Sequence, residues 1–173
     1  MTAKPGDKAT VSVHVAVCIE DAFEVFTNEI DSWWRHGPKY RIAGKRVGRL
    51  TFEPMLNGRL LETVALGRGS RTFEVGKVVE WSPPMRLALE WRGVNFAPHE
   101  VTFVIVTFTP TETGTLVRLE HLGWSAIRDD HPARHGLTGS EFTAFIGMWW
   151  ADLLTALRQH VAQKTSRDDH DTA

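Results

Sequence analysis

"TGSEFTAFIGMWWADLLTALRQHV", residues 138–161, has the most regular hydrophobic pattern in the chain. Its apolar residues recur every three or four positions, which is the spacing of one face of an α-helix. They are Phe142, Phe145, Ile146, Trp149, Leu153, Leu157 and Val161. Thr138 and Glu141 have the spacing of a capping box, in which a hydroxyl and a carboxylate satisfy free backbone N–H groups. We therefore predict one long amphipathic helix that ends at about Gln163.

The chain before this helix is rich in β-forming residues. Between Arg46 and Trp124, short strand-like runs are separated by turn residues at hairpin spacing. The breaks fall at Asn57-Gly58, residues 67–70, Pro83-Pro84, residues 95–98 and residues 110–114. An alternating apolar pattern at 11–18 predicts a first strand, and the run from Glu20 to Trp34 predicts one or two short helices.

These elements predict an α+β fold with a curved antiparallel sheet of about seven strands. Such a sheet twists, and the apolar stripe of the long helix must cover its concave face. At 173 residues, one domain with a substantial core is expected. We place that domain at 10–163, with a disordered N-terminus at 1–9 and a flexible C-terminal tail at 164–173.

Composition narrows the possible partners. The net charge is −1 and there is no basic block, so neither nucleic acid nor a membrane surface is expected as a partner. The single Cys18 excludes an internal disulfide and a cysteine-cluster metal site, which fits a reducing, cytoplasmic location. No phosphate loop, dinucleotide fingerprint or nucleophile elbow is present, so no cofactor is expected.

Several segments resemble the START-like (SRPBCC, helix-grip) superfamily, in the branch homologous to the C-terminal domain of the activator of the heat-shock-protein-90 ATPase. They are "EDAFEVFTNEIDSWW", "FEPMLNGRLLE", "VGKVVEWSPPMRLALEW", "VTFTPTETGTLVRLEHLGW" and "MWWADLLTAL". They follow one another in the family's order from about Val11 to Val161. A Gly-Gly-Arg turn usual in this branch stands here as Asn57-Gly58-Arg59.

The resemblance implies a helix-grip fold and one of three functions. The first is binding of a small, mainly hydrophobic molecule in the cavity between the sheet and the C-terminal helix. The second is a cyclase, dehydratase or hydrolase that uses the same cavity. The third is a co-chaperone-like interaction module. We favour the first over the other two, and whether the protein is an enzyme stays open.

Large rings are the main candidates for a cavity wall, because they fill or line volumes that aliphatic side chains leave open. The chain has seven Trp and nine Phe residues but one Tyr. The candidate rings are Trp33, Trp34, Phe52, Phe73, Trp81, Trp91, Phe142, Phe145 and Trp149. Each of them could equally be a packed core residue.

The polar candidates are Arg59, Glu62 and His121. Strand alternation places Leu60, Glu62 and Val64 on one face, and a buried carboxylate there needs a partner such as Arg59 or Arg71. His121 shares an apolar face with Val117 and Leu119, either as a cavity contact or as a hydrogen-bonded core residue. In an enzyme, His121 and Glu62 would be the catalytic candidates. Rim or surface ion pairs are the alternative interpretation of Arg59 and Glu62.

Two further features need an interpretation. His131 and His135 could lie one turn apart, but a third metal ligand is missing, and Asp129 and Asp130 are explained as a helix-start signal. We predict a solvated connector and no metal site. Phe103 and Ile105 would lie on the convex face of the sheet, where an uncovered apolar patch would favour a homodimer.

Overall fold

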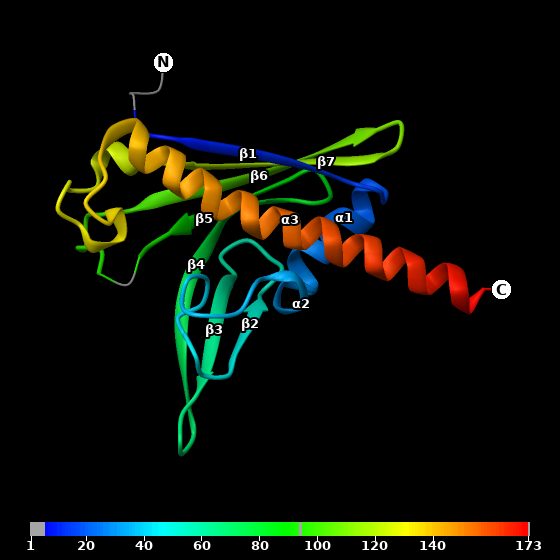
Figure 1. The fold of residues 1–173 in the computed structure, drawn as a ribbon, viewed down its shortest axis with the longest axis horizontal. Coiled ribbons are helices and arrows are strands. Elements are labelled where there is room, and N and C mark those ends of the chain that lie inside the picture. Colours follow the sequence, from blue (N-terminus) through cyan, green and yellow to red (C-terminus); the bar gives the residue numbers. More distant parts are fainter. Residues whose placement is uncertain (1–5, 94, 173) are drawn as a thin grey trace.

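The computed structural model describes residues 6–93 and 95–172 of the chain. It contains one seven-stranded antiparallel sheet in the order β1-β7-β6-β5-β4-β3-β2, crossed by a long C-terminal helix (Figure 1). The strands are β1 (Ala9–Val15), β2 (Gly48–Phe52), β3 (Arg59–Ala65), β4 (Ser70–Ser82), β5 (Arg86–Trp91), β6 (Thr102–Thr111) and β7 (Gly114–Leu122). The predicted α+β fold is thereby confirmed, as is the placement of the turns between strands.

Two short helices follow the first strand, as predicted. They are α1 (Ile19–Asn28) and α2 (Ile30–Trp33). The acidic residues Glu20 and Asp21 lie in the first turn of α1, where they stabilise its positive end. Ala22, Phe23 and Phe26 face the core, which fixes α1 against the sheet. Two 3-10 turns, η1 (Trp124–Ala126) and η2 (Pro132–Arg134), lead into the last helix.

The last helix, α3 (Gly139–Asp171), confirms the predicted amphipathic element but differs at both ends. Thr138 is the N-cap, yet its side chain makes no capping hydrogen bond, so the predicted capping box is wrong. The helix also continues well past Gln163. Lys164 forms an ion pair with Glu29, between α1 and α2, and the Thr165 hydroxyl donates to the Val161 carbonyl, so local contacts extend the helix into the predicted tail.

The buried face of α3 is shifted slightly from the predicted stripe. Trp150, rather than Trp149, is fully buried, because it lies on the same face as Leu153, Leu154 and Leu157. The main core joins this face to α1, α2 and the concave side of the sheet. A second, smaller cluster forms at the start of α3, from Trp124, Ile127 and Phe142.

The end of the N-terminal stretch expected to be disordered contacts the body. The Ser125 hydroxyl donates to the Asp7 carboxylate, and Lys8 forms an ion pair with Glu120 on β7. β1 begins at Ala9, inside the predicted disordered segment. Residues 1–5 lie outside the described part of the chain.

Candidate functional site

A cavity of about 540 Å³ opens beside the β3–β4 end of the sheet. Its lining comes from the end of α2, the connection to β2, strands β2 to β5, the residues after β5, and α3. The lining residues are Trp34, Tyr40, Ile42, Leu50, Glu62, Arg71, Phe73, Glu74, Val75, Trp91, Arg92, Gly93, Phe96 and Trp149. This volume lies in the range of about 300–1,000 Å³ that is usual for small-molecule sites.

Six of the fourteen lining residues are aromatic. Trp34 stacks on Trp91 with 6.3 Å between ring centroids, and Trp149 meets Trp34 edge-on at 5.9 Å. The indole N–H groups of Trp34 and Trp149 donate to the carbonyls of Tyr40 and Lys39. Because these polar edges are satisfied by the backbone, the rings have a fixed orientation and can offer apolar surface to a ligand.

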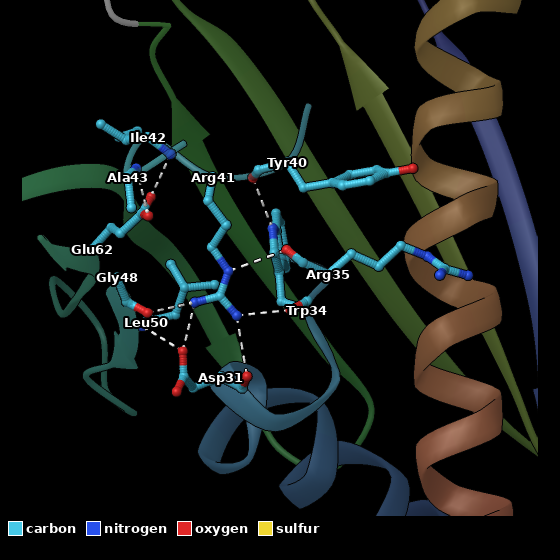
Figure 2. A network of polar contacts seen from close by, with 10 residues as sticks. All are labelled: Asp31, Trp34, Arg35, Tyr40, Arg41, Ile42, Ala43, Gly48, Leu50 and Glu62. Carbon is cyan, nitrogen blue, oxygen red and sulfur yellow. Dashed lines mark hydrogen bonds and ion pairs between the residues drawn. The ribbon is translucent and has the colours of Figure 1, made fainter. Parts of the chain in front are cut away.

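Residues 35–47, which join α2 to β2, form a strap along one side of the cavity. The buried Arg41 holds it: its guanidinium donates to the Asp31 carboxylate at 2.6 Å and to the Trp34 carbonyl at 2.7 Å (Figure 2). Further along the strap, the Asp152 carboxylate of α3 accepts hydrogen bonds from Lys39 and Tyr40. The cavity was expected between the sheet and α3. Its lining includes Trp149 of α3, and the strap forms a further side of it.

Glu62 is only 2% exposed and lies at the cavity, as the strand alternation predicted. Arg59, one of its two candidate partners, does not pair with it: Arg59 faces the other side of β3 and forms a surface ion pair with Glu53, as the alternative interpretation predicted. Instead, the backbone N–H groups of Ile42 and Ala43 donate to the two carboxylate oxygens at 2.8 and 3.0 Å (Figure 2). Gly48 makes room for this arrangement, since a Cβ there would lie 2.7 Å from Glu62 Oε1. Glu62 therefore anchors the strap to the sheet.

The strand register gives the cavity a defined floor. Leu50 of β2 lies opposite Glu62 of β3, and Glu62 lies opposite Phe73 of β4. These three side chains share the concave face. Arg71 lies two residues before Phe73 on the same face, with its guanidinium 4.9 Å from the centre of the Phe73 ring. The floor thus combines an apolar surface with the buried Glu62 carboxylate and, at its solvent-exposed side, the Arg71 guanidinium.

His121 does not line the cavity. It is 1% exposed and both ring nitrogens are occupied: Trp150 Nε1 donates to Nδ1 at 3.0 Å, and Nε2 lies 2.8 Å from the Thr102 hydroxyl. Burial lowers the pKa of His121 to about 3, so the ring is neutral. Of the two predicted alternatives, the geometry corresponds to the hydrogen-bonded core histidine.

The remaining candidate rings lie outside the cavity. Trp33 and Phe52 are buried in the main core, and Trp81 packs there against Phe23. Phe142 is in the smaller cluster, with Phe145 packed against it. Of the residues named from the sequence, the cavity collects Trp34, Glu62, Arg71, Phe73, Trp91 and Trp149.

Eight lining residues were not among the predicted site residues, namely Tyr40, Ile42, Leu50, Glu74, Val75, Arg92, Gly93 and Phe96. Five of them lie in irregular connections, where no hydrophobic period marks which way a side chain points, and the other three lie in β2 and β4. Tyr40 carries one usable signal: it is the only tyrosine in a chain rich in other rings.

The histidines after β7 form a structural connector. Pro132 opens the predicted short turn, η2. The expected solvent exposure of His131 is wrong, because that residue is 2% exposed; its Nδ1 accepts from the Ala133 N–H, and its ring meets Phe96 edge-on. Within residues 6–93 and 95–172, no group of three or more His, Cys, Asp or Glu side chains could hold a metal ion.

The curved sheet wrapped around a long C-terminal helix defines a helix-grip protein of the START-like superfamily. A family model described as "Activator of Hsp90 ATPase homolog 1-like protein" matches residues 16–159. The chain belongs to this family, as the sequence motifs predicted. In the described part of the chain, no helix is long and apolar enough to cross a membrane.

Solved structures support the same fold. A protein from Cytophaga hutchinsonii has a TM-score of 0.64 at 15% identity, over 96% of this chain and 99% of that one. A protein from Mesorhizobium loti has a TM-score of 0.61 at 20% identity, over 91% and 98% of the two chains. An AHSA1-like protein from Aeromonas hydrophila has a TM-score of 0.59 at 16% identity, over 91% and 94%. No curated protein matches the chain significantly.

Proposed function

We propose that this protein binds a small, mainly hydrophobic organic molecule in the cavity between β2–β5, the strap and Trp149. The observation that carries the proposal is the cavity itself, about 540 Å³ in volume and lined by six aromatic side chains. Burial of apolar ligand surface contributes about 25 cal/mol per Å², so contact with these rings is the main source of affinity.

The family's fold fits this proposal, since helix-grip proteins enclose space between sheet and helix. The enzyme alternative has less support from the site. His121 is separated from the cavity behind Trp91 and Trp150, and both Glu62 oxygens accept backbone hydrogen bonds. A proton-transfer group needs hydrogen-bond reach to the substrate, and His121 lacks it, so the two catalytic candidates do not meet in one site.

Filling the cavity tests the proposal. Val75 is half-buried and lines the cavity, so Val75→Trp should occupy ligand volume. Val79 lies on the same strand, is 42% exposed and does not line the cavity, so Val79→Trp is the matched control. We expect equilibrium dialysis with 2-methylnaphthalene to show one bound molecule per wild-type chain, and Val75→Trp to weaken binding at least about tenfold.

The Val79→Trp control should retain wild-type affinity. Native mass spectrometry of gently purified protein provides an independent readout, because a molecule retained by wild type and Val79→Trp but not by Val75→Trp would identify the natural ligand. Absence of probe binding to wild type, or equal binding to both variants, would show that the cavity is not a ligand site.

A further inference from the structure

The cavity floor holds two opposite charges that are neighbours without being paired. Glu62 lies opposite Phe73 across β3 and β4, and Arg71 lies opposite Val64 in the next pair along. Glu62 and Arg71 are therefore diagonal neighbours on one face, a relation that brings side chains within reach of each other. Arg71 instead lies over the Phe73 ring, and no ion pair links it to Glu62 or to another described residue.

Each of these groups keeps unused hydrogen-bonding capacity. A carboxylate has about four acceptor positions, and Glu62 uses two of them for the N–H groups of Ile42 and Ala43. A guanidinium has five N–H donors, and among the described residues the Arg71 group contacts the face of Phe73. The floor thus has spare acceptors and spare donors side by side, with no net charge between the two side chains.

From this pairing we infer that the ligand carries, at its β3–β4 end, a neutral polar group that both donates and accepts hydrogen bonds, such as an alcohol, a phenol or a primary amide. The inference rests on the proposed function and specifies the ligand class for the same site. The group donates to Glu62 and accepts from Arg71, while the rest of the molecule lies against the aromatic wall.

Charged ligands fit this floor less well. A cationic group at Glu62 lies next to the Arg71 guanidinium, and an anionic group at Arg71 lies next to the Glu62 carboxylate. Either ion must also leave water to enter the cavity, at a much larger cost than a hydroxyl. Two exposed lining residues, Arg92 and Glu74, also carry opposite charges, so together they favour neither ion.

Four probes with one ring system separate these possibilities. They are 2-naphthalenemethanol, 2-methylnaphthalene, 2-naphthoate and 2-naphthylmethylammonium, compared by equilibrium dialysis at pH 7. We expect the alcohol to bind about tenfold more tightly than each of the other three, which is the effect of one hydrogen bond to a charged group.

Two variants assign the effect to the floor. Glu62→Gln and Arg71→Met should each reduce the preference for the alcohol over 2-methylnaphthalene to about twofold or less. Arg49→Met is the matched control: Arg49 lies on β2 beside Leu50 but is exposed on the other face, and it should retain the preference. Because Glu62 also anchors the strap, thermal unfolding of Glu62→Gln is measured in parallel, and Arg71→Met decides the result if that variant fails to fold.

The outcomes separate a failure of the inferred ligand class from a failure of the proposed function. Tightest binding of 2-naphthoate would show that the arginines select an anion, and tightest binding of 2-naphthylmethylammonium would show that Glu62 selects a cation; either result overturns the inference. Equal affinity for the alcohol and 2-methylnaphthalene would overturn it and leave the proposed function intact. Binding of none of the four probes would overturn both.

Discussion

His121 illustrates how one buried polar side chain is made compatible with the core. Trp150 Nε1 can only donate, so His121 Nδ1 accepts and the ring proton lies on Nε2. Nε2 then donates to the Thr102 hydroxyl, which donates in turn to the Trp91 carbonyl at 2.9 Å. Every donor in this series of hydrogen bonds has an acceptor, and a proton added to Nδ1 would break the hydrogen bond that Nδ1 accepts from Trp150.

Stability should consequently fall on mild acidification. The unfolded chain takes up the His121 proton near pH 6.5, whereas the folded chain resists it down to a pKa of about 3, so a lower pH favours unfolding. Protonation of His121 in the unfolded chain should lower the free energy of unfolding by about 1 kcal/mol between pH 7 and 5.5, a range above that in which carboxylates titrate. Urea unfolding at both pH values measures this difference. In His121→Gln, which cannot titrate at this position, the difference in free energy of unfolding between the two pH values should be smaller by about 1 kcal/mol. If the free energy of unfolding depended on pH as strongly in His121→Gln as in wild type, His121 would not be the source of the effect.

The strap is the element whose position depends most on single polar side chains. Residues 35–47 contain no regular helix or strand; some of their backbone groups pair in turns within the strap, and the others need partners elsewhere. Arg41 is 5% exposed and donates to the carbonyls of Asp31, Trp34, Arg35 and Gly48 as well as to the Asp31 carboxylate. One guanidinium thus joins α2, the strap and β2 (Figure 2).

Removing that guanidinium should destabilise the protein strongly. Arg41→Met leaves several carbonyls without donors, which costs about 1–3 kcal/mol, whereas the Asp31 side chain is 38% exposed and water can partly replace its cation. Arg46→Met, at an exposed position of the same strap, should change stability by less than about 0.5 kcal/mol. Chemical unfolding of both variants checks the difference. A similar small effect for both would show that the strap does not depend on Arg41.

For the whole molecule, the hydrophobic periods and turn residues of the sequence predicted the fold but only part of the cavity lining. The period of α3 and the turn residues between strands gave the helix-grip architecture, and alternation in β3 placed Glu62 on the cavity side. Alternation says which face a side chain occupies but not which neighbour it meets, so it could not show that backbone N–H groups of the strap, rather than Arg59 or Arg71, are the partners of Glu62. The strap contributes Tyr40 and Ile42 through tertiary contacts alone, and these have no local signature.

A homodimer through the convex face remains a prediction. Phe103 and Ile105 are half-buried there; Phe103 lies across from Leu122 and Glu90, and Ile105 from Glu120. The apolar strip is therefore narrow and bordered by carboxylates. A second copy would have to cover the strip while leaving Glu90 and Glu120 at the rim of the contact, where charges stay hydrated.

Introducing a charge into the strip tests the dimer. Phe103→Glu places a carboxylate at its centre, where association would have to remove it from water at a cost of several kcal/mol. If the convex face is the interface, light scattering after size exclusion should give a dimer mass for wild type and a monomer mass for the variant. Thr107→Glu is the control on the same strand and face, at a half-buried position further along the strand, and should retain the dimer. Monomer masses for wild type and Phe103→Glu alike would rule out this interface, as would a dimer that survives the substitution.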